Sequence, residues 1–136
     1  MGIRHTSLLA LALICAGAVL PAIMRAEEPG ADAAILAAGQ KVFSDKCERC
    51  HDIGTISQRK AYGPNLFGVV GRKAGTLEAF AYSKALRESG LVWTEEQLRA
   101  WMANNTGLLP GTRMRHVGIT DPGEQDLLLA YLQSLK

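Results

Sequence analysis

Aromatic side chains are scarce in this sequence, and other absences narrow the class of protein further. Only 6% of the 136 residues are Phe, Trp or Tyr, so a core built from protein side chains alone would be thin. The formal net charge is only +2 and no Lys/Arg cluster stands out, which argues against a nucleic-acid-binding protein. Three cysteines are too few for a disulfide scaffold, and repeats and heptads are missing. One globular domain with 48% hydrophobic residues remains.

Residues 1–26 match the pattern of a secretory signal peptide. Arg4 and His5 form a basic start, and an uncharged run of 17 residues follows them. This run is shorter than the ~20 residues that span a bilayer, so retention as a membrane anchor is the alternative to cleavage. Cleavage is expected after Ala26, or else after Ala18. Cleavage after Ala26 would leave a single domain of 110 residues, 27–136, with 13 basic and 13 acidic side chains and no net charge.

Helical periodicity and capping residues predict an all-α domain, because no stretch alternates with period 2. Asp32 is the expected cap of a first helix over 33–47. Gly39 inside that helix predicts a closely approaching second helix, since glycine costs about 1 kcal/mol there relative to alanine. The expected buried face holds Ile35, Val42 and Phe43.

Three further helices are predicted along the chain. A short one covers 83–89 and ends before Gly90. Thr94-Glu95-Glu96-Gln97 is a capping box that opens a helix to about Asn104, with Leu98, Trp101 and Met102 facing inward. Asp121-Pro122-Gly123-Glu124 opens the last helix. Its apolar stripe consists of Leu127, Leu128, Tyr131, Leu132 and Leu135. Residues 51–78 form a long glycine-containing loop, which needs something to wrap around.

Residues 47–51 carry the chemistry of the chain. Their sequence, C-E-R-C-H, is the attachment signature of c-type haem. Cysteines three positions apart on a helical turn face the same way, so Cys47 and Cys50 can reach two vinyl groups of one porphyrin. The adjoining His51 then presents an imidazole to the iron. The haem would also supply the hydrophobic mass that the few aromatics do not.

Three other uses of these side chains compete with haem attachment. A redox dithiol would want a βαβ context, which the sequence lacks. A zinc site could recruit Cys47, Cys50, His51 and His116, but adjacent ligands at 50 and 51 suit a tetrahedron poorly. A disulfide, which export would permit, would be strained across two intervening residues. Haem attachment is the favoured interpretation.

The opposite face of the iron needs a second ligand or an opening. Met114 is the best-placed candidate, on a turn-rich loop between two predicted helices. A lone methionine usually fills space in a core, but the charged neighbours Arg113 and Arg115 argue against a core position for Met114. His116 is the rival ligand, since bis-histidine coordination is the other possibility.

Short motifs accompany the haem signature: Gly39-Gln40-Lys41-Val42-Phe43, Gly63-Pro64-Asn65-Leu66, Gly71-Arg72-Lys73, Tyr82, Trp93, Pro110-Gly111-Thr112-Arg113-Met114 and Ala130-Tyr131-Leu132. Along almost all of the mature chain, the sequence resembles the class I soluble cytochromes c of mitochondrial and bacterial periplasmic type. The resemblance implies a small all-α cytochrome c fold. In that fold the N- and C-terminal helices cross, and long loops wrap one haem c bound through two thioethers.

The resemblance also implies roles for individual residues. Cys47 and Cys50 would bind the haem covalently, and His51 and Met114 would ligate the iron. The Pro64 carbonyl would accept a hydrogen bond from the ligand histidine and orient it. The remaining haem contacts are Arg72, Tyr82 and Trp93 at the inner propionate and Thr112 in the methionine loop.

Three positions depart from the family's pattern. Trp101 stands where the family usually has a tyrosine that hydrogen-bonds the methionine sulfur, and the indole N–H can donate in its place. Leu86 replaces a common buried asparagine, and His116 replaces a common aromatic after the ligand. These departures bear on the reduction potential.

The expected function is that of an electron carrier rather than an enzyme, because both axial positions of the iron would be filled. A dissociable Met114 would instead allow a haem-dependent peroxidase or a gas-binding protein. A dedicated cytochrome subunit of a periplasmic dehydrogenase is the other alternative.

The expected setting is the periplasm, or the membrane surface if the N-terminal segment is retained. A monomer would meet a membrane reductase and a terminal oxidase or reaction centre in small, weak encounters, with only transient membrane contact. Charges would assist: the expected cationic ring at the haem edge is Lys46, Arg59, Lys60, Arg113 and Arg115. The acidic side chains expected to be remote from it are Glu95, Glu96, Glu124 and Asp126.

Overall fold

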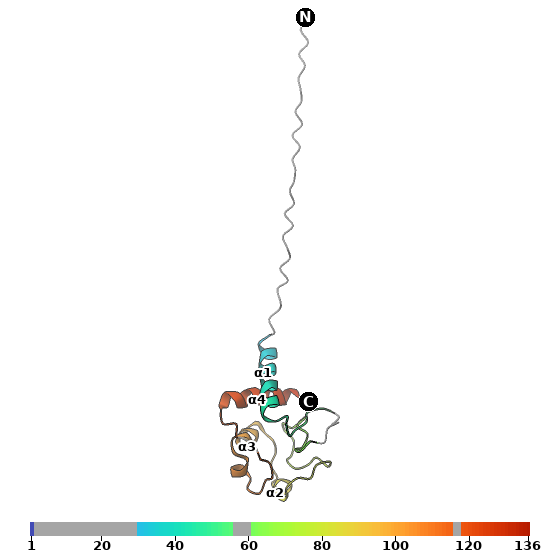
Figure 1. Cartoon of the computed structure of the whole chain (residues 1–136), viewed down its shortest axis with the longest axis vertical. Helices are drawn as coiled ribbons and strands as arrows, with labels where there is room; N and C mark the ends of the chain where they lie inside the picture. Colours follow the sequence, from blue (N-terminus) through green and yellow to red (C-terminus); the bar gives the residue numbers. More distant parts are fainter. Residues whose placement is uncertain (2–29, 56–60, 116–117) are drawn as a thin grey trace.

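The computed structural model describes residue 1 and residues 30–55, 61–115 and 118–136. These residues form the helices α1 (Ala31–Lys46), α2 (Lys84–Glu88), α3 (Glu95–Leu108) and α4 (Pro122–Ser134), joined by long loops (Figure 1). Within the described ranges, the only strand-like pairing is one antiparallel bridge between Lys73 and Val92. The all-α prediction is therefore confirmed. Apart from Met1, the expected signal peptide lies outside the described residues, and none of the described helices has the length and apolarity to cross a membrane.

Helices α1 and α4, from opposite ends of the domain, cross each other (Figure 1). Gly39 lies at the crossing. A Cβ atom built on it would lie 2.1 Å from the Leu127 carbonyl oxygen and 2.7 Å from the Tyr131 Cβ. Beside this contact the rings of Phe43 and Tyr131 pack with centroids 5.9 Å apart. The predicted close approach at Gly39 is confirmed, and it fixes the end of α1 from which the haem signature continues.

The start of α1 differs from the prediction. The helix begins at Ala31, with Gly30 as its N-cap and no side-chain cap hydrogen bond. Asp32 lies inside the first turn, where its charge favours the positive end of the helix dipole but caps nothing. Ile35 is 43% exposed, because it lies one turn before the crossing at Gly39, so its predicted burial is wrong. Phe43 is buried as predicted.

Helices α3 and α4 start where their capping residues predict, and α2 starts one residue after its predicted start at 83, with Ser83 as its N-cap. The Ser83 hydroxyl accepts from the Leu86 N–H, the Thr94 hydroxyl from the Gln97 N–H, and the Asp121 carboxylate from the Glu124 N–H. The capping box at Thr94 is only half formed. The Thr94 N–H donates to the Val92 carbonyl, so the Gln97 side chain does not accept from it as a full capping box requires. The Gln97 Oε1 is buried and has no hydrogen-bond partner among the described residues.

Helix α3 continues beyond the predicted end but bends there. Asn104 has an extended backbone (φ −157°, ψ 85°) between two helical stretches, and the second stretch ends at Leu108. The Asn104 side chain accepts from the Gly107 N–H at 2.9 Å and so caps this second stretch. The expected end near Asn104 therefore marks a kink, with one further turn after it.

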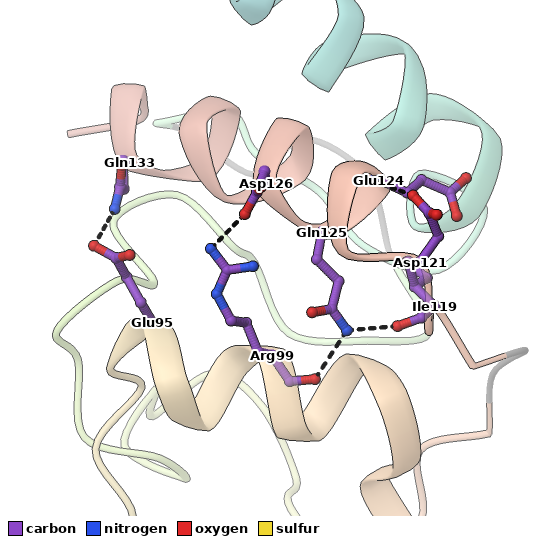
Figure 2. A network of polar contacts seen from close by, with 8 residues as sticks. All are labelled: Glu95, Arg99, Ile119, Asp121, Glu124, Gln125, Asp126 and Gln133. Carbon is purple, nitrogen blue, oxygen red and sulfur yellow. Dashed lines mark hydrogen bonds and ion pairs between the residues drawn. The ribbon is translucent and has the colours of Figure 1, made fainter.

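Polar side chains link α3 to α4 (Figure 2). Gln125, buried on α4, donates to the carbonyl oxygens of Ile119 at 2.7 Å and Arg99 at 3.3 Å. Toward solvent, Arg99 pairs with Asp126 and Gln133 donates to Glu95. Ile119 also donates its N–H to the Met102 carbonyl of α3. The chain between α3 and α4 is thus tied down where it returns to α4.

Candidate haem-binding cavity

A cavity of about 600 Å³ opens between the long loops and helices α3 and α4. This volume lies in the range typical of small-molecule and cofactor sites. Its apolar walls include Val69, Leu86, Leu98, Met102, Leu128 and Leu132. All ten residues predicted for the site also line it: Cys47, Cys50, His51, Pro64, Arg72, Tyr82, Trp93, Trp101, Thr112 and Met114.

The haem signature forms one wall, just after the end of α1. The Cys47 N–H still donates to the Phe43 carbonyl, and the N–H groups of Cys50 and His51 both donate to the Cys47 carbonyl. This turn brings all three side chains to the cavity. Both cysteines are free. Burial, with a smaller contribution from Cys50, raises the pKa of Cys47 to about 11, so its thiol is protonated at neutral pH.

The imidazole of His51 is buried and held from its far side. Its Nδ1 lies 2.8 Å from the Pro64 carbonyl oxygen. A carbonyl only accepts, so Nδ1 must carry the proton and Nε2 the lone pair that a metal requires. Gly63 makes this fit possible: a Cβ atom there would lie 2.5 Å from the ring Cε1. The Gly63-Pro64 segment thus fixes both the tautomer and the place of the ring.

The loop after α3 contributes a thioether to the cavity. The Met114 sulfur accepts a hydrogen bond from the Trp101 indole N–H at 3.1 Å. Trp101 is itself held by an edge-to-face contact with Trp93, at 5.0 Å between ring centroids. Thr112 lies in the turn before Met114, and its hydroxyl is 3.4 Å from the Met114 N–H. Trp101 therefore makes the contact expected of the tyrosine it replaces.

Arg72 and Tyr82 form the polar part of the cavity. The Arg72 guanidinium donates to the carbonyl oxygens of Asn65 at 2.9 Å and Phe67 at 3.0 Å. Burial lowers the pKa of Arg72, while burial raises that of Tyr82 against an opposing effect of the guanidinium. At neutral pH the pair is thus a half-buried cation beside a neutral phenol. That is a favourable environment for a carboxylate.

Part of the predicted cationic ring borders the cavity. Lys46, Arg113 and Arg115 line it, while Arg59, Lys60 and the rival ligand His116 lie outside the described residues. One expectation is wrong: Glu124 is not remote from these cations. Its carboxylate lies 3.6 Å from the Lys46 ammonium, because the crossing of α1 and α4 brings the end of one helix to the start of the other.

Asn105 is a site residue that sequence reasoning missed. It is only 5% exposed, and its amide Nδ2 donates to the Met114 carbonyl at 2.8 Å. The one available signal was a second asparagine directly after Asn104, late in a predicted helix, where asparagine is unfavourable. Leu86, a departure noted in the sequence, is buried in the cavity wall.

The walls fit a flat, mostly apolar group that carries carboxylates and a metal. Two free thiols, an imidazole and a thioether line the same cavity. The guanidinium and phenol lie where a carboxylate could be buried. Haem c has these features, so the residues present fit it.

Comparisons with known proteins agree with this chemistry. The family model described as "Cytochrome c" matches residues 36–136. "Cytochrome c2" of Rhodoblastus acidophilus is 42% identical over 99 residues, covering 73% of this chain and 91% of the relative. "Cytochrome c" of Chlamydomonas reinhardtii is 40% identical over 108 residues, covering 79% and 93%. The solved structure of "cytochrome cH from Methylobacterium extorquens" has a TM-score of 0.66 and 41% identity, covering 73% of this chain and 97% of that one.

The chain belongs to the cytochrome c family. Its fold is the small all-α cytochrome c fold. Its cofactor is the covalently attached haem c of that family, with Cys47 and Cys50 at the attachment spacing. Family membership supports a mono-haem electron carrier.

Proposed function

We propose that this protein carries single electrons with an iron ligated by His51 and Met114. One observation carries the proposal: the His51 imidazole and the Met114 thioether, which lie far apart in the sequence, line the same cavity, and each is held by a hydrogen bond. When bound, haem c supplies the one-electron Fe(III)/Fe(II) couple. A thioether and an imidazole together favour a high reduction potential.

The chain's own residues would bind the haem, orient its histidine ligand and shield it from water. Cys47 and Cys50 supply the two thioether sulfurs. The Pro64 carbonyl keeps the proton of His51 on Nδ1, so the Nε2 lone pair would be available to the iron. The Arg72 guanidinium would neutralise a propionate and the Tyr82 phenol would hydrogen-bond it, while the surrounding leucines and tryptophans exclude water. A dry, rigid site needs little rearrangement when its charge changes, which suits electron transfer.

The hold on Met114 favours a carrier over a peroxidase or gas-binding protein. Its sulfur is fixed by the Trp101 indole, and Trp101 is packed against Trp93. A ligand held in this way keeps the sixth position closed to small molecules. With Met114 as a ligand, the bound haem would exchange electrons without binding a substrate at its iron.

Export to the periplasm is part of the proposal. The basic start and apolar run of residues 1–26 support it, with cleavage leaving the domain 27–136. Redox partner proteins at the membrane, a reductase and an oxidase or reaction centre, would then be the donor and acceptor. Lys46, Arg113 and Arg115 beside the cavity would assist brief docking.

Removal of the thioether tests the ligand set. The oxidised wild-type protein should show a near-infrared sulfur-to-iron absorption band, and its reduced form should not bind CO. Met114→Ala should lose the band and bind CO. The pair Met114→Ala with His116→Ala covers the case in which His116 replaces the lost ligand. A wild-type protein that has no sulfur band, or a Met114→Ala variant that keeps it, would refute Met114 ligation.

A further inference from the structure

Asn105 binds the backbone of Met114, and Trp101 binds the side chain of the same residue. Its Nδ2 donates to the Met114 carbonyl at 2.8 Å, and the side chain is almost fully buried. Because a carbonyl only accepts, the amide nitrogen must be the group that faces it. Met114 is therefore fixed at two points, its sulfur by Trp101 and its carbonyl by Asn105.

Both contacts come from α3. Trp101 lies before the kink at Asn104 and Asn105 directly after it, so the regular spacing of a straight helix does not relate their side chains. The kink at Asn104 falls between them and sets their relative placement. The Asn104 side chain stabilises this kink by capping the last turn of α3. The bend that ends the straight part of α3 thus serves to bring Asn105 against the methionine loop.

Within the part of the loop that the structure describes, the contact of Met114 with its own loop is weak. Its N–H lies 3.4 Å from the Thr112 hydroxyl, which is long for a hydrogen bond. Arg113 and Arg115, its direct neighbours, are both exposed. Among the described residues, the Asn105 amide therefore makes the closest hydrogen bond to the Met114 backbone.

We propose that Asn105 is a positioning residue that retains Met114 at the iron. Together with Trp101 it forms a two-point hold, here called the Met114 clamp. The inference rests on the proposed ligation by Met114 and adds to it a residue that keeps the thioether from leaving. Loss of the amide frees the loop at the carbonyl, so the thioether dissociates more often, while the rest of the fold stays in place.

The test is a titration of the oxidised holoprotein with imidazole, which displaces Met114 from the iron. Loss of the near-infrared sulfur band measures the displacement. Asn105→Leu keeps the approximate size but donates nothing. We expect its half-displacing imidazole concentration to fall about tenfold, as for loss of one well-formed hydrogen bond to a buried carbonyl. Asn105→Asp should fall further, because a carboxylate repels the carbonyl. Asn105→Gln keeps the donor and should stay closer to the wild type than Asn105→Leu.

Leu129→Ala is the matched control, since Leu129 is buried in α4 and does not line the cavity. It should lower thermal stability and leave the half-displacing concentration within about twofold of the wild type, because its cavity lies away from Met114. If Asn105→Leu does not fold, Asn105→Asp and Asn105→Gln give the same comparison. Equal half-displacing concentrations in the wild type and Asn105→Leu would overturn the clamp. A wild type without the sulfur band would instead overturn the proposed ligation.

Discussion

Gly39→Ala tests the crossing of α1 and α4 on which the cavity is built. A Cβ atom at this position would lie 2.1 Å from the Leu127 carbonyl oxygen and 2.7 Å from the Tyr131 Cβ, whereas ordinary contacts begin at 3.4 Å. The neighbouring atoms belong to a helix backbone and a Cβ, so no side-chain rotation relieves the clash. The two helices would have to separate by about 1 Å, and overpacking of this kind typically costs ~1–3 kcal/mol.

Helix propensity works in the opposite direction. Alanine in place of glycine inside a helix should gain about 1 kcal/mol. The exposed residue Ala37, on the same helix, provides the matched control: Ala37→Gly measures the propensity difference alone. We expect the overpacking cost to exceed the propensity gain, so Gly39→Ala should be destabilised by up to ~2 kcal/mol and its thermal midpoint should fall, by up to about 10 °C.

Thermal unfolding of the holoprotein, followed by far-ultraviolet circular dichroism, measures both variants. A Gly39→Ala protein that is more stable than the wild type, by the amount that Ala37→Gly loses, would refute the close crossing. It would show that position 39 behaves like an exposed helical site. Gly39→Leu should be more damaging than Gly39→Ala, because a larger group meets the same backbone.

Three further predictions concern the attachment of haem, the fit of Gly63 against the His51 ring and the pH dependence of stability. Cys47→Ser with Cys50→Ser should release all haem into acidified organic solvent and leave a largely unfolded chain; haem retained through this extraction would contradict attachment at these sulfurs. Gly63→Ala should displace the His51 ring, since the new Cβ would lie 2.5 Å from Cε1, and should lower stability by ~1–3 kcal/mol, which denaturant titration checks; unchanged stability would contradict the tight fit. Burial raises the pKa of Tyr131 above its ordinary value of 10, so the stability that this neutral phenol contributes is present below pH 10 and lost as pH rises through the raised pKa. Unfolding free energies should therefore fall above pH 10 more steeply in the wild type than in Tyr131→Phe, and equal slopes would contradict the shift.

Local signals predicted the helices well. Thr94 and Asp121 cap the helices that they were expected to cap, because a capping side chain acts within three residues of itself. Ser83, expected inside a helix over 83–89, is instead the N-cap of α2. The prediction that Asp32 caps α1 was wrong, because an acidic residue is favourable both at the N-cap and in the first turn of a helix. The chain uses Gly30 instead, two positions earlier.

Contacts between distant segments were predictable only where a residue type demands them. Gly39 inside a helix indicated the close contact with α4, and the C-x-x-C-H motif indicated the cavity that its side chains line. The burial of Ile35 and the distance of Glu124 depend on where α1 and α4 cross, which no local pattern contains. Asn105 became visible only with the kink at Asn104, since a straight helix gives no reason to place its amide on the methionine loop.

A potentiometric titration of the full holoprotein, monitored by its visible spectrum, shows whether the protein is a one-electron carrier with Met114 as an iron ligand. The wild type should show one reversible one-electron step. Met114→Ala should also titrate in one step, but at a clearly lower potential, because its iron loses a thioether that favours Fe(II). An irreversible wild-type titration, more than one step, or an unchanged potential in Met114→Ala would contradict a mono-haem electron carrier with Met114 as its ligand.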